Sequence, residues 1–200
     1  MKKFLFIFAL GLSFSLNSHA LTIDLVPAAS QISAGNTVQI DAKISGLKTS
    51  GATSLGVYDV NVNFDSSRFA FNSINWGDSV KGNQLDLNHF GSLQISDSSN
   101  SGWINLFELS FDDVWSLENL QANSFILFSL VFSSIAPGTG VFHLDANALG
   151  DAYGNNLALT STTDARVTVK AASVPEPATN MLMLIGLIAL GLARVKPSDK

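Results

Sequence analysis

Residues 56–64 read Gly-Val-Tyr-Asp-Val-Asn-Val-Asn-Phe, with large apolar side chains at every second position from Tyr58 to Phe64. Successive side chains of a β-strand point to opposite faces, so this alternation predicts a strand with one buried and one polar face. Its inward residues would be Tyr58, Val60, Val62 and Phe64. The run Asp65-Ser66-Ser67 follows. It predicts a turn, because short polar side chains bond nearby backbone amides.

The same alternation recurs along the chain between residues 21 and 171. Eight or nine strands in roughly 150 residues, separated by clusters of Gly, Asn, Ser and Asp, are typical of two packed antiparallel sheets. The predicted fold class of this region is therefore all-β, a two-sheet antiparallel sandwich. Besides residues 56–64, we expect strands at Thr22–Val26, Thr37–Ile44, Arg68–Ile74, Trp103–Phe111, Phe125–Ile135, Gly140–Ala146 and Ala165–Ala171.

Three further segments have a weaker pattern. Gln84–Phe90 and Leu93–Ile95 alternate over a few residues, which predicts short edge strands. Asp112–Ala122 carries apolar residues near the spacing of a helical turn, which predicts a brief helix. The strand at 103–111 is partly apolar on both faces, and we expect Trp103 to lie in phase with the buried positions.

Several of these segments together resemble the cohesin-like domain family. They are Leu21–Pro27, Ala34–Ile40, Tyr58–Asp65 and Arg68–Phe71, followed by Leu127–Ser133, Phe142–Tyr153 and Arg166–Val169. The resemblance covers most of residues 21–171. It implies a jelly-roll or Greek-key sandwich that is used for recognition and not for bond-breaking.

The N-terminus has the organisation of a secretory signal peptide. A pair of lysines precedes an apolar block at residues 4–16, and small residues follow at 17–20. We predict a signal peptide at residues 1–20 that is cleaved between Ala20 and Leu21. The chain contains no cysteine. The exported domain is therefore held together by burial of apolar side chains, without disulfides.

The C-terminal segment, residues 172–200, begins with a prolyl motif, Val174-Pro175-Glu176-Pro177. An apolar run and several basic residues follow the motif. Sixteen helical residues extend about 24 Å, against a hydrocarbon core of about 30 Å, so a span of this length would be marginal. We expect a linker at 172–177, a transmembrane helix at 178–193 and a basic tail at 194–200.

This order of parts resembles the PEP-CTERM sorting signal of Gram-negative bacteria that produce exopolysaccharide. The residues that carry the resemblance are Val174, Pro175, Glu176, Pro177 and, after the apolar run, Arg194. The resemblance implies recognition by an exosortase-type sorting protease. It also implies an inner-membrane intermediate, cleavage near the motif, and transfer of the domain to the cell surface or extracellular matrix.

The charge of the exported region argues against nucleic acid as a partner. Residues 21–173 include 14 acidic and 6 basic side chains, an excess of eight negative charges. Such a surface repels nucleic-acid phosphates. The sequence also has no nucleophile elbow, metal-binding histidine pair or phosphate-binding loop. Nothing marks Glu108 and Glu118, the only glutamates of this region, as a catalytic pair. We expect no catalytic residues and no enzymatic activity.

Two kinds of ligand contact remain as hypotheses. Trp76 and Trp115 lie in irregular segments, and exposed aromatic rings there could stack on sugar rings. Residues 145–156 begin like a calcium loop but place Leu and Asn where such a loop needs oxygen ligands and a final Glu. A sandwich-type Ca²⁺ site that uses Asp145 and Asp151 is left open; otherwise we expect no metal and no cofactor.

These patterns favour a non-enzymatic, exported surface or extracellular-matrix protein, with adhesion or exopolysaccharide and biofilm association as its expected role. Its partners would be the sorting protease, the membrane before processing, and a polysaccharide or a surface protein. The alternative is a carbohydrate-binding module that recognises an extracellular polysaccharide.

Overall fold

The computed structural model of the 200-residue chain describes residues 21–48, 52–171 and 179–193. The chain divides into two compact units, Met1–Lys170 and Ala171–Lys200. The predicted signal peptide at 1–20, the linker at 172–177 and the basic tail at 194–200 lie outside the described residues.

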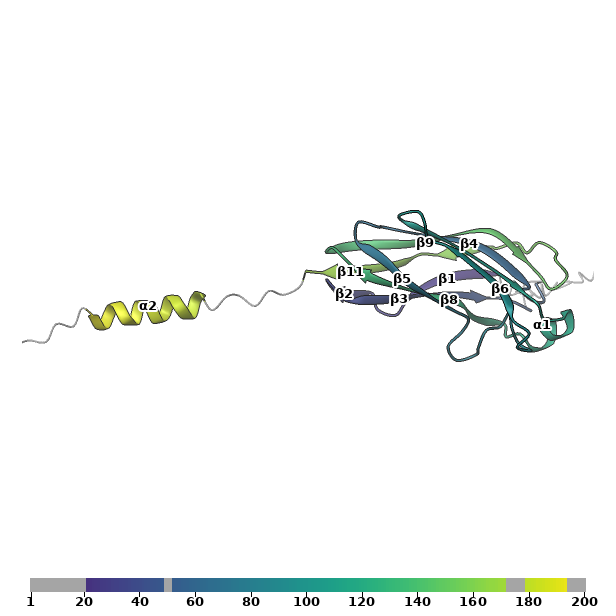
Figure 1. Cartoon of the computed structure of the whole chain (residues 1–200), viewed down its shortest axis with the longest axis horizontal. Helices are drawn as coiled ribbons and strands as arrows, with labels where there is room; N and C mark the ends of the chain where they lie inside the picture. The colour runs from purple at the N-terminus through teal and green to yellow at the C-terminus, as the bar shows by residue number, and fades with distance from the viewer. Residues whose placement is uncertain (1–20, 49–51, 172–178, 194–200) are drawn as a thin grey trace, which may run out of the picture. The chain divides into compact units, whose positions relative to one another are not determined.

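The first unit is a sandwich of two sheets (Figure 1). One sheet has five strands, in the order β10 (Ser161–Thr163), β1 (Thr22–Pro27), β3 (Thr37–Ser45), β8 (Ser124–Ser134) and β5 (Phe69–Trp76). The other has six strands, in the order β2 (Gln31–Ser33), β11 (Ala165–Lys170), β9 (Gly138–Gly150), β4 (Val57–Phe64), β7 (Trp103–Ser110) and β6 (Ser92–Asp97). The predicted all-β, two-sheet fold is confirmed.

The pairing within the sheets is mixed, although antiparallel pairs predominate. Two three-residue strands at the sheet edges run parallel to their neighbours: β10 pairs with β1, and β2 pairs with β11. The prediction of a wholly antiparallel sandwich is wrong at these two edges. Successive strands from β3 to β5 and from β7 to β9 alternate between the sheets. Each of them therefore contributes one apolar face to a common core.

The core lies between the two sheets. Tyr58, Val60 and Val62 of β4 are fully buried in it, as the alternation of 56–64 predicts. A chain of aromatic rings closes one end of the core, with ring centroids 4.8 Å apart for Phe132 and Phe142. Each buried Phe, Leu, Ile or Val contributes roughly 1.5–3 kcal/mol to stability. A domain without cysteines depends on this burial, because it has no disulfides to stabilise it.

Strand β7 buries the face opposite to the one predicted. Ile104 and Leu106 are fully buried, whereas Trp103 lies on the outer face and is half-buried. A shift of one residue exchanges the two faces of a strand, and a strand that is apolar on both sides gives no pattern to choose between them. Glu108 shares the inward face because the interior offers its carboxylate hydrogen-bond donors.

The segment between β5 and β7 is also only partly as expected. The edge strand predicted at Leu93–Ile95 is present as β6. The strand predicted at Gln84–Phe90 is absent, and this segment forms turns. The backbone N–H groups of this segment bond an aspartate side chain where a strand would bond the backbone of its neighbour: Asp112 accepts from the backbone of Leu87 and Asn88. Aspartates bond backbone amides in this way and so favour turns over strands.

A short helix, α1 (Val114–Leu120), follows β7 and confirms the helix predicted within 112–122. It begins where Asp113 caps its first turn, because the Asp113 side chain accepts from the backbone N–H of Ser116 at 3.0 Å. Leu117 is the apolar residue that the helix buries. The helix presents Trp115 to solvent.

The second unit contains one described helix, α2 (Thr179–Ala193), of 15 residues. It occupies nearly all of the range predicted as a transmembrane helix, 178–193. Within the described residues, however, no helix has both the length and the apolar character needed to cross a membrane.

Candidate binding surface

The outer face of the six-stranded sheet carries a row of amide and carboxylate side chains across β7, β4 and β9. In β4 the residues that alternate with the buried positions are Asp59, Asn61 and Asn63, so the same sequence pattern that builds the core also builds this row. Asn105 of β7 lies directly opposite Asn61. We call Asp59, Asn61, Asn63, Asn105, Asp145 and Asn147 the polar ladder.

The side chains of the polar ladder bond one another. Asn105 donates to Asp59 Oδ1 at 2.7 Å and to Asn61 Oδ1 at 2.9 Å. On the β9 side, Asn147 donates to Asp59 Oδ1 at 3.0 Å. Asn61 and Asn63 donate to β9 in turn, Asn61 to Asn147 at 3.2 Å and Asn63 to Asp145 at 2.7 Å. The ladder is thus held in one arrangement before any partner binds.

An imidazole extends the ladder toward β11. The His143 ring lies between two carboxylates, with Nδ1 at 2.6 Å from Asp164 Oδ1 and Nε2 at 3.2 Å from Asp145 Oδ1. The hydrogen bond with Asp164 raises the pKa of His143 above its ordinary value, against a smaller opposing effect of burial. Protonated His143 therefore compensates part of the negative charge on this face.

The β6 end of the same face is apolar. Leu93 is 42% exposed and Ile95 is 50% exposed. Their register partners on β7, Leu109 and Phe107, are half-buried. Because residues opposite each other in antiparallel strands share a face, the four side chains form one strip, which we call the apolar strip. An exposed apolar strip beside a fixed polar surface is characteristic of interaction sites.

A buried carboxylate supports this edge from inside. Glu108 is fully buried, and its Oε1 accepts from Asn83 at 2.6 Å, from Ser92 at 2.6 Å and from Gln94 at 2.9 Å. Its Oε2 accepts from the Tyr58 hydroxyl at 2.9 Å. Burial, followed by the negative charge of Glu108, raises the pKa of Tyr58 well above its ordinary value. The network fixes β6 and the segment before it to β7.

The tryptophans predicted to contact sugars are not brought together. Trp76 ends β5, is half-buried and packs against the core, whereas Trp115 on α1 is 64% exposed. Among the described residues, neither ring lies against another aromatic ring, since the six ring pairs involve only Phe and Tyr. They do not form a shared platform.

The two aspartates considered for calcium are also apart. Asp145 belongs to the polar ladder, and Asp151 follows the end of β9, about 20 Å further along at ~3.3 Å per residue. Asp151 caps a turn by accepting from the backbone of Tyr153 and Asn155. In the described part of the chain, no group of three or more His, Asp or Glu side chains is placed to hold a metal ion.

The predicted processing sites lie at or beyond the limits of the described residues. Leu21 is the first described residue, is buried, and accepts a 2.8 Å hydrogen bond from Thr160. Ala20, the motif Val174–Pro177 and Arg194 lie outside the described residues.

The sequence indicates the polar ladder but neither the apolar strip nor the buried Glu108. Asp59, Asn61 and Asn63 alternate with apolar residues, so the pattern places them on the solvent face of a strand. Glu108 and the apolar strip were missed because the inward face of β7 cannot be read from a strand that is apolar on both sides.

Comparison with solved structures identifies the fold. A type I cohesin in a cohesin–dockerin complex from Clostridium thermocellum superposes with a TM-score of 0.59 at 10% identity, over 77% of this chain and 96% of the cohesin. A type II cohesin from the Acetivibrio cellulolyticus cellulosome gives 0.58 at 12%, over 74% and 95%. A non-cellulosomal cohesin from Archaeoglobus fulgidus gives 0.55 at 13%, over 82% and 97%.

The fold is cohesin-like. These cohesins are covered almost completely, so the similarity extends through the whole sandwich. No protein-family model matches the sequence, and no curated protein matches it at a significant level. Identities of 10–13% support a shared fold alone. The binding properties of the cohesin-like domain therefore depend on the residues of its own surface.

Proposed function

We propose that the cohesin-like domain is a non-enzymatic protein-binding module that works outside the cell. The observation that carries the proposal is the outer face of the six-stranded sheet, where the apolar strip adjoins the polar ladder. Several structural neighbours are cohesins in complexes with dockerins, which supports a protein partner. The specific partner of this chain need not be a dockerin.

The arrangement of the face suits a protein partner. The centre of a protein interface is typically apolar and depleted of charge, and its rim is polar. Leu93 and Ile95 supply apolar area, and the ladder supplies hydrogen-bonding groups that are already fixed. Fixed side chains lose little conformational entropy on binding, so more of the interaction energy appears as affinity.

The titratable side chains support a non-catalytic role. Glu108 is fully buried and engaged by four donors, so it cannot reach a substrate. Glu118 lies on α1 and accepts from Tyr153 at 3.3 Å. The His143 ring has both nitrogens occupied by carboxylates, which leaves neither free for a nucleophile.

We further propose that the terminal segments direct the domain to its place of work. The signal peptide at 1–20 would export the chain, and an exosortase-type protease would recognise the Pro175–Pro177 motif with the apolar helix behind it. The domain would then act at the surface or in the matrix of a Gram-negative bacterium, in adhesion or biofilm association. The excess of negative charge and the lack of cysteine are compatible with this location.

Affinity capture tests the proposal. The cohesin-like domain would be immobilised and exposed to surface and matrix proteins of the producing bacterium, and the affinity of the retained protein would then be measured with purified partner. We expect Ile95→Glu to weaken binding at least tenfold, because it places a charge in the apolar strip. Lys43→Glu adds the same side chain to the exposed face of the other sheet and should leave binding unchanged. Equal affinities for both variants would contradict the proposal.

A further inference from the structure

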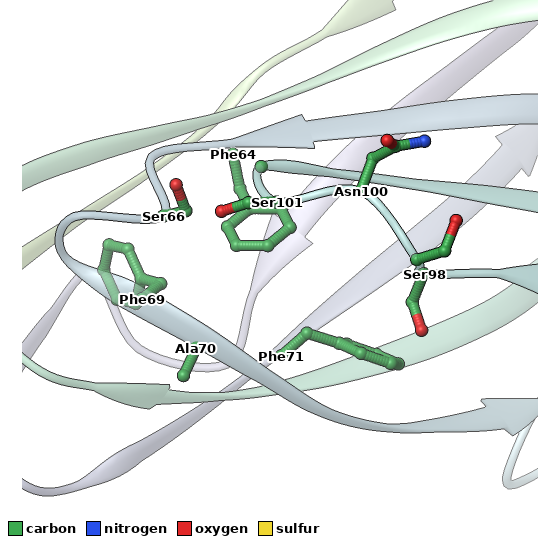
Figure 2. A pocket seen from close by; sticks show the side chains of 10 residues that line it. Phe64, Ser66, Phe69, Ala70, Phe71, Ser98, Asn100 and Ser101 are labelled. Carbon is green, nitrogen blue, oxygen red and sulfur yellow. The ribbon is translucent and has the colours of Figure 1, made fainter.

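A pocket of about 430 Å³ opens between the two sheets, at a site that the polar ladder and the apolar strip do not include. It is open to solvent and is bordered by two turns, the one from β4 to β5 and the one from β6 to β7, and by the start of β5. Its volume lies in the range of roughly 300–1,000 Å³ that is usual for small-molecule sites. Figure 2 shows the pocket from close by.

One wall of the pocket is aromatic. Phe64, Phe69 and Phe71 line it, and in Figure 2 the ring of Phe71 extends below the turn that carries Ser98 and Asn100. The rings are held from behind by the core, with centroids 4.9 Å apart for Phe64 and Phe132 and 5.8 Å apart for Phe71 and Phe132. Phe64 and Phe71 are half-buried, so each offers part of a fixed apolar ring to the pocket.

The opposite rim carries uncharged polar groups. Ser66, Ser98, Asn100 and Ser101 line it, and in the described part of the chain their side chains have no hydrogen-bond partner. The neighbouring serines, Ser67 and Ser99, instead bond aspartates at the start of each turn. The pocket therefore presents hydroxyl and amide groups that are available to a ligand.

The two turns are fixed to each other. Ser67 and Ser99 donate backbone N–H groups to Asp65 and Asp97, which shapes each turn. Phe64 donates its backbone N–H to the carbonyl of Gly102 at 2.8 Å, which joins the turns. Gly102 has a φ of 93°, a conformation that glycine adopts without strain. The rim and the aromatic wall are thus positioned before a ligand arrives.

The lining decides the class of ligand. It consists of Phe, Ser, Ala, Asn and Gly, with no ionisable side chain. A charged ligand would lose hydration here without gaining a counter-charge, and the negative surface of the domain disfavours anions further. A neutral sugar ring matches both walls, because its C–H face can lie on phenyl rings while its hydroxyls bond serine and asparagine.

We propose that this pocket binds a neutral pyranose. The site goes beyond the proposed protein-binding function, because it uses none of the residues of the polar ladder or the apolar strip. It also differs from the tryptophan contacts predicted from the sequence, since neither Trp76 nor Trp115 lines it. The pyranose could be a free monosaccharide or one unit of a polysaccharide.

The experiment is an NMR and calorimetric titration of the full-length chain in a detergent without a sugar headgroup. The probes are methyl glycosides of glucose, galactose and mannose, and neutral oligosaccharides of the same sugars. We expect at least one probe to shift the amide signals of residues 64–71 and 98–102 together. An oligosaccharide that binds at least tenfold tighter than its methyl glycoside would identify a polysaccharide unit, and equal affinities would identify a free sugar.

Two variants and two controls decide the outcome. Asn100→Ala should weaken binding at least fivefold, and Ala70→Trp, which fills the pocket from an exposed position, should abolish it. Asn123→Ala removes another exposed asparagine that lies outside the pocket and should have no effect. Wild-type affinity in Ala70→Trp, loss of binding in Trp115→Ala, or no response to any neutral sugar would each overturn the proposal. Ile95→Glu should bind sugar normally, so failure of this proposal is distinguishable from failure of the protein-binding one.

Discussion

Tyr58 of β4 donates a 2.9 Å hydrogen bond to Glu108 of β7 in the interior of the sandwich, where both residues are fully buried. A carboxylate in such a place is tolerated only when its oxygens are satisfied. Three further donors complete the set, and all of them lie on β6 or the segment before it. The network therefore connects the core to the edge that carries the apolar strip.

Removal of the tyrosine hydroxyl should destabilise the domain. We expect Tyr58→Phe to lower the free energy of unfolding by about 1–3 kcal/mol, because it takes one donor from a buried carboxylate and leaves the packing intact. Tyr153→Phe is the matched control. Its hydroxyl donates to Glu118 at the surface, and its loss should change stability by less than about 0.5 kcal/mol. Urea denaturation measures both, and equal effects would show that the hydrogen bond from Tyr58 to Glu108 contributes nothing to stability.

Removal of the carboxylate should have a larger effect. Glu108→Ala takes the carboxylate acceptor away from four donors, of which Asn83 alone keeps a second, long hydrogen bond, to Ser92 Oγ at 3.4 Å, and we expect a loss of about 3 kcal/mol or more. Those donors position β6. The substitution should therefore accelerate amide hydrogen exchange, relative to wild type, by a larger factor in Ser92–Asp97 than in β3. Uniform acceleration in both strands would mean that the network stabilises the domain as a whole and not this edge.

The extent to which the sequence predicts this structure differs between two adjacent strands. In β4 apolar and polar residues alternate strictly from Tyr58 to Phe64, so its buried face and the ladder on its other face could both be derived from these residues. In β7 both faces are apolar, and the choice depends on donors that come from Asn83, Ser92 and Gln94. The pocket could not be predicted because its two turns are joined by a backbone contact between Phe64 and Gly102, which are far apart in the sequence.

The stability of the domain should depend on pH through His143. Its pKa is raised in the folded state, chiefly by the hydrogen bond with Asp164. The corresponding stabilisation is therefore fully present below the unfolded pKa of about 6.5, and it is lost as the pH rises through the folded pKa. The side chain is 47% exposed, so solvent screening should limit the effect to about 1 kcal/mol or less.

Urea denaturation between about pH 5.5 and pH 8.5, on either side of the ordinary histidine pKa, would measure this dependence. Wild type and His143→Gln should differ most at the acid end and converge at the alkaline end. Asp164→Asn serves as the control, since NMR titration should then place the pKa of His143 nearer to its ordinary value. A stability difference between wild type and His143→Gln that grows with pH would contradict the expected direction.

Close packing leaves no room for a side chain at Gly140 of β9. A Cβ at Gly140 would lie 2.4 Å from a ring carbon of Phe69, which is buried and cannot move aside. We expect Gly140→Ala to lower the free energy of unfolding by about 1–3 kcal/mol through overpacking. Thr139→Ala, at the exposed neighbouring position, should change it by less than about 0.5 kcal/mol. Similar melting curves for the two variants would mean that the Phe69 ring is free to shift.

The proposed sorting segment predicts a specific defect in processing. In a host that has the sorting protease, the wild-type chain should lose its C-terminal segment, and mass spectrometry of the mature protein should find its new C-terminus near the Val174–Pro177 motif. Glu176→Ala removes the acidic side chain between the two prolines and should remain full-length in the membrane fraction. Ser173→Ala alters a residue just outside the motif and should be processed normally. Because both positions lie in the sequence outside residues 21–171, a difference between the two variants reports on recognition of the motif and not on folding. Equal processing of Glu176→Ala and wild type would remove the sorting assignment while leaving the binding proposals standing.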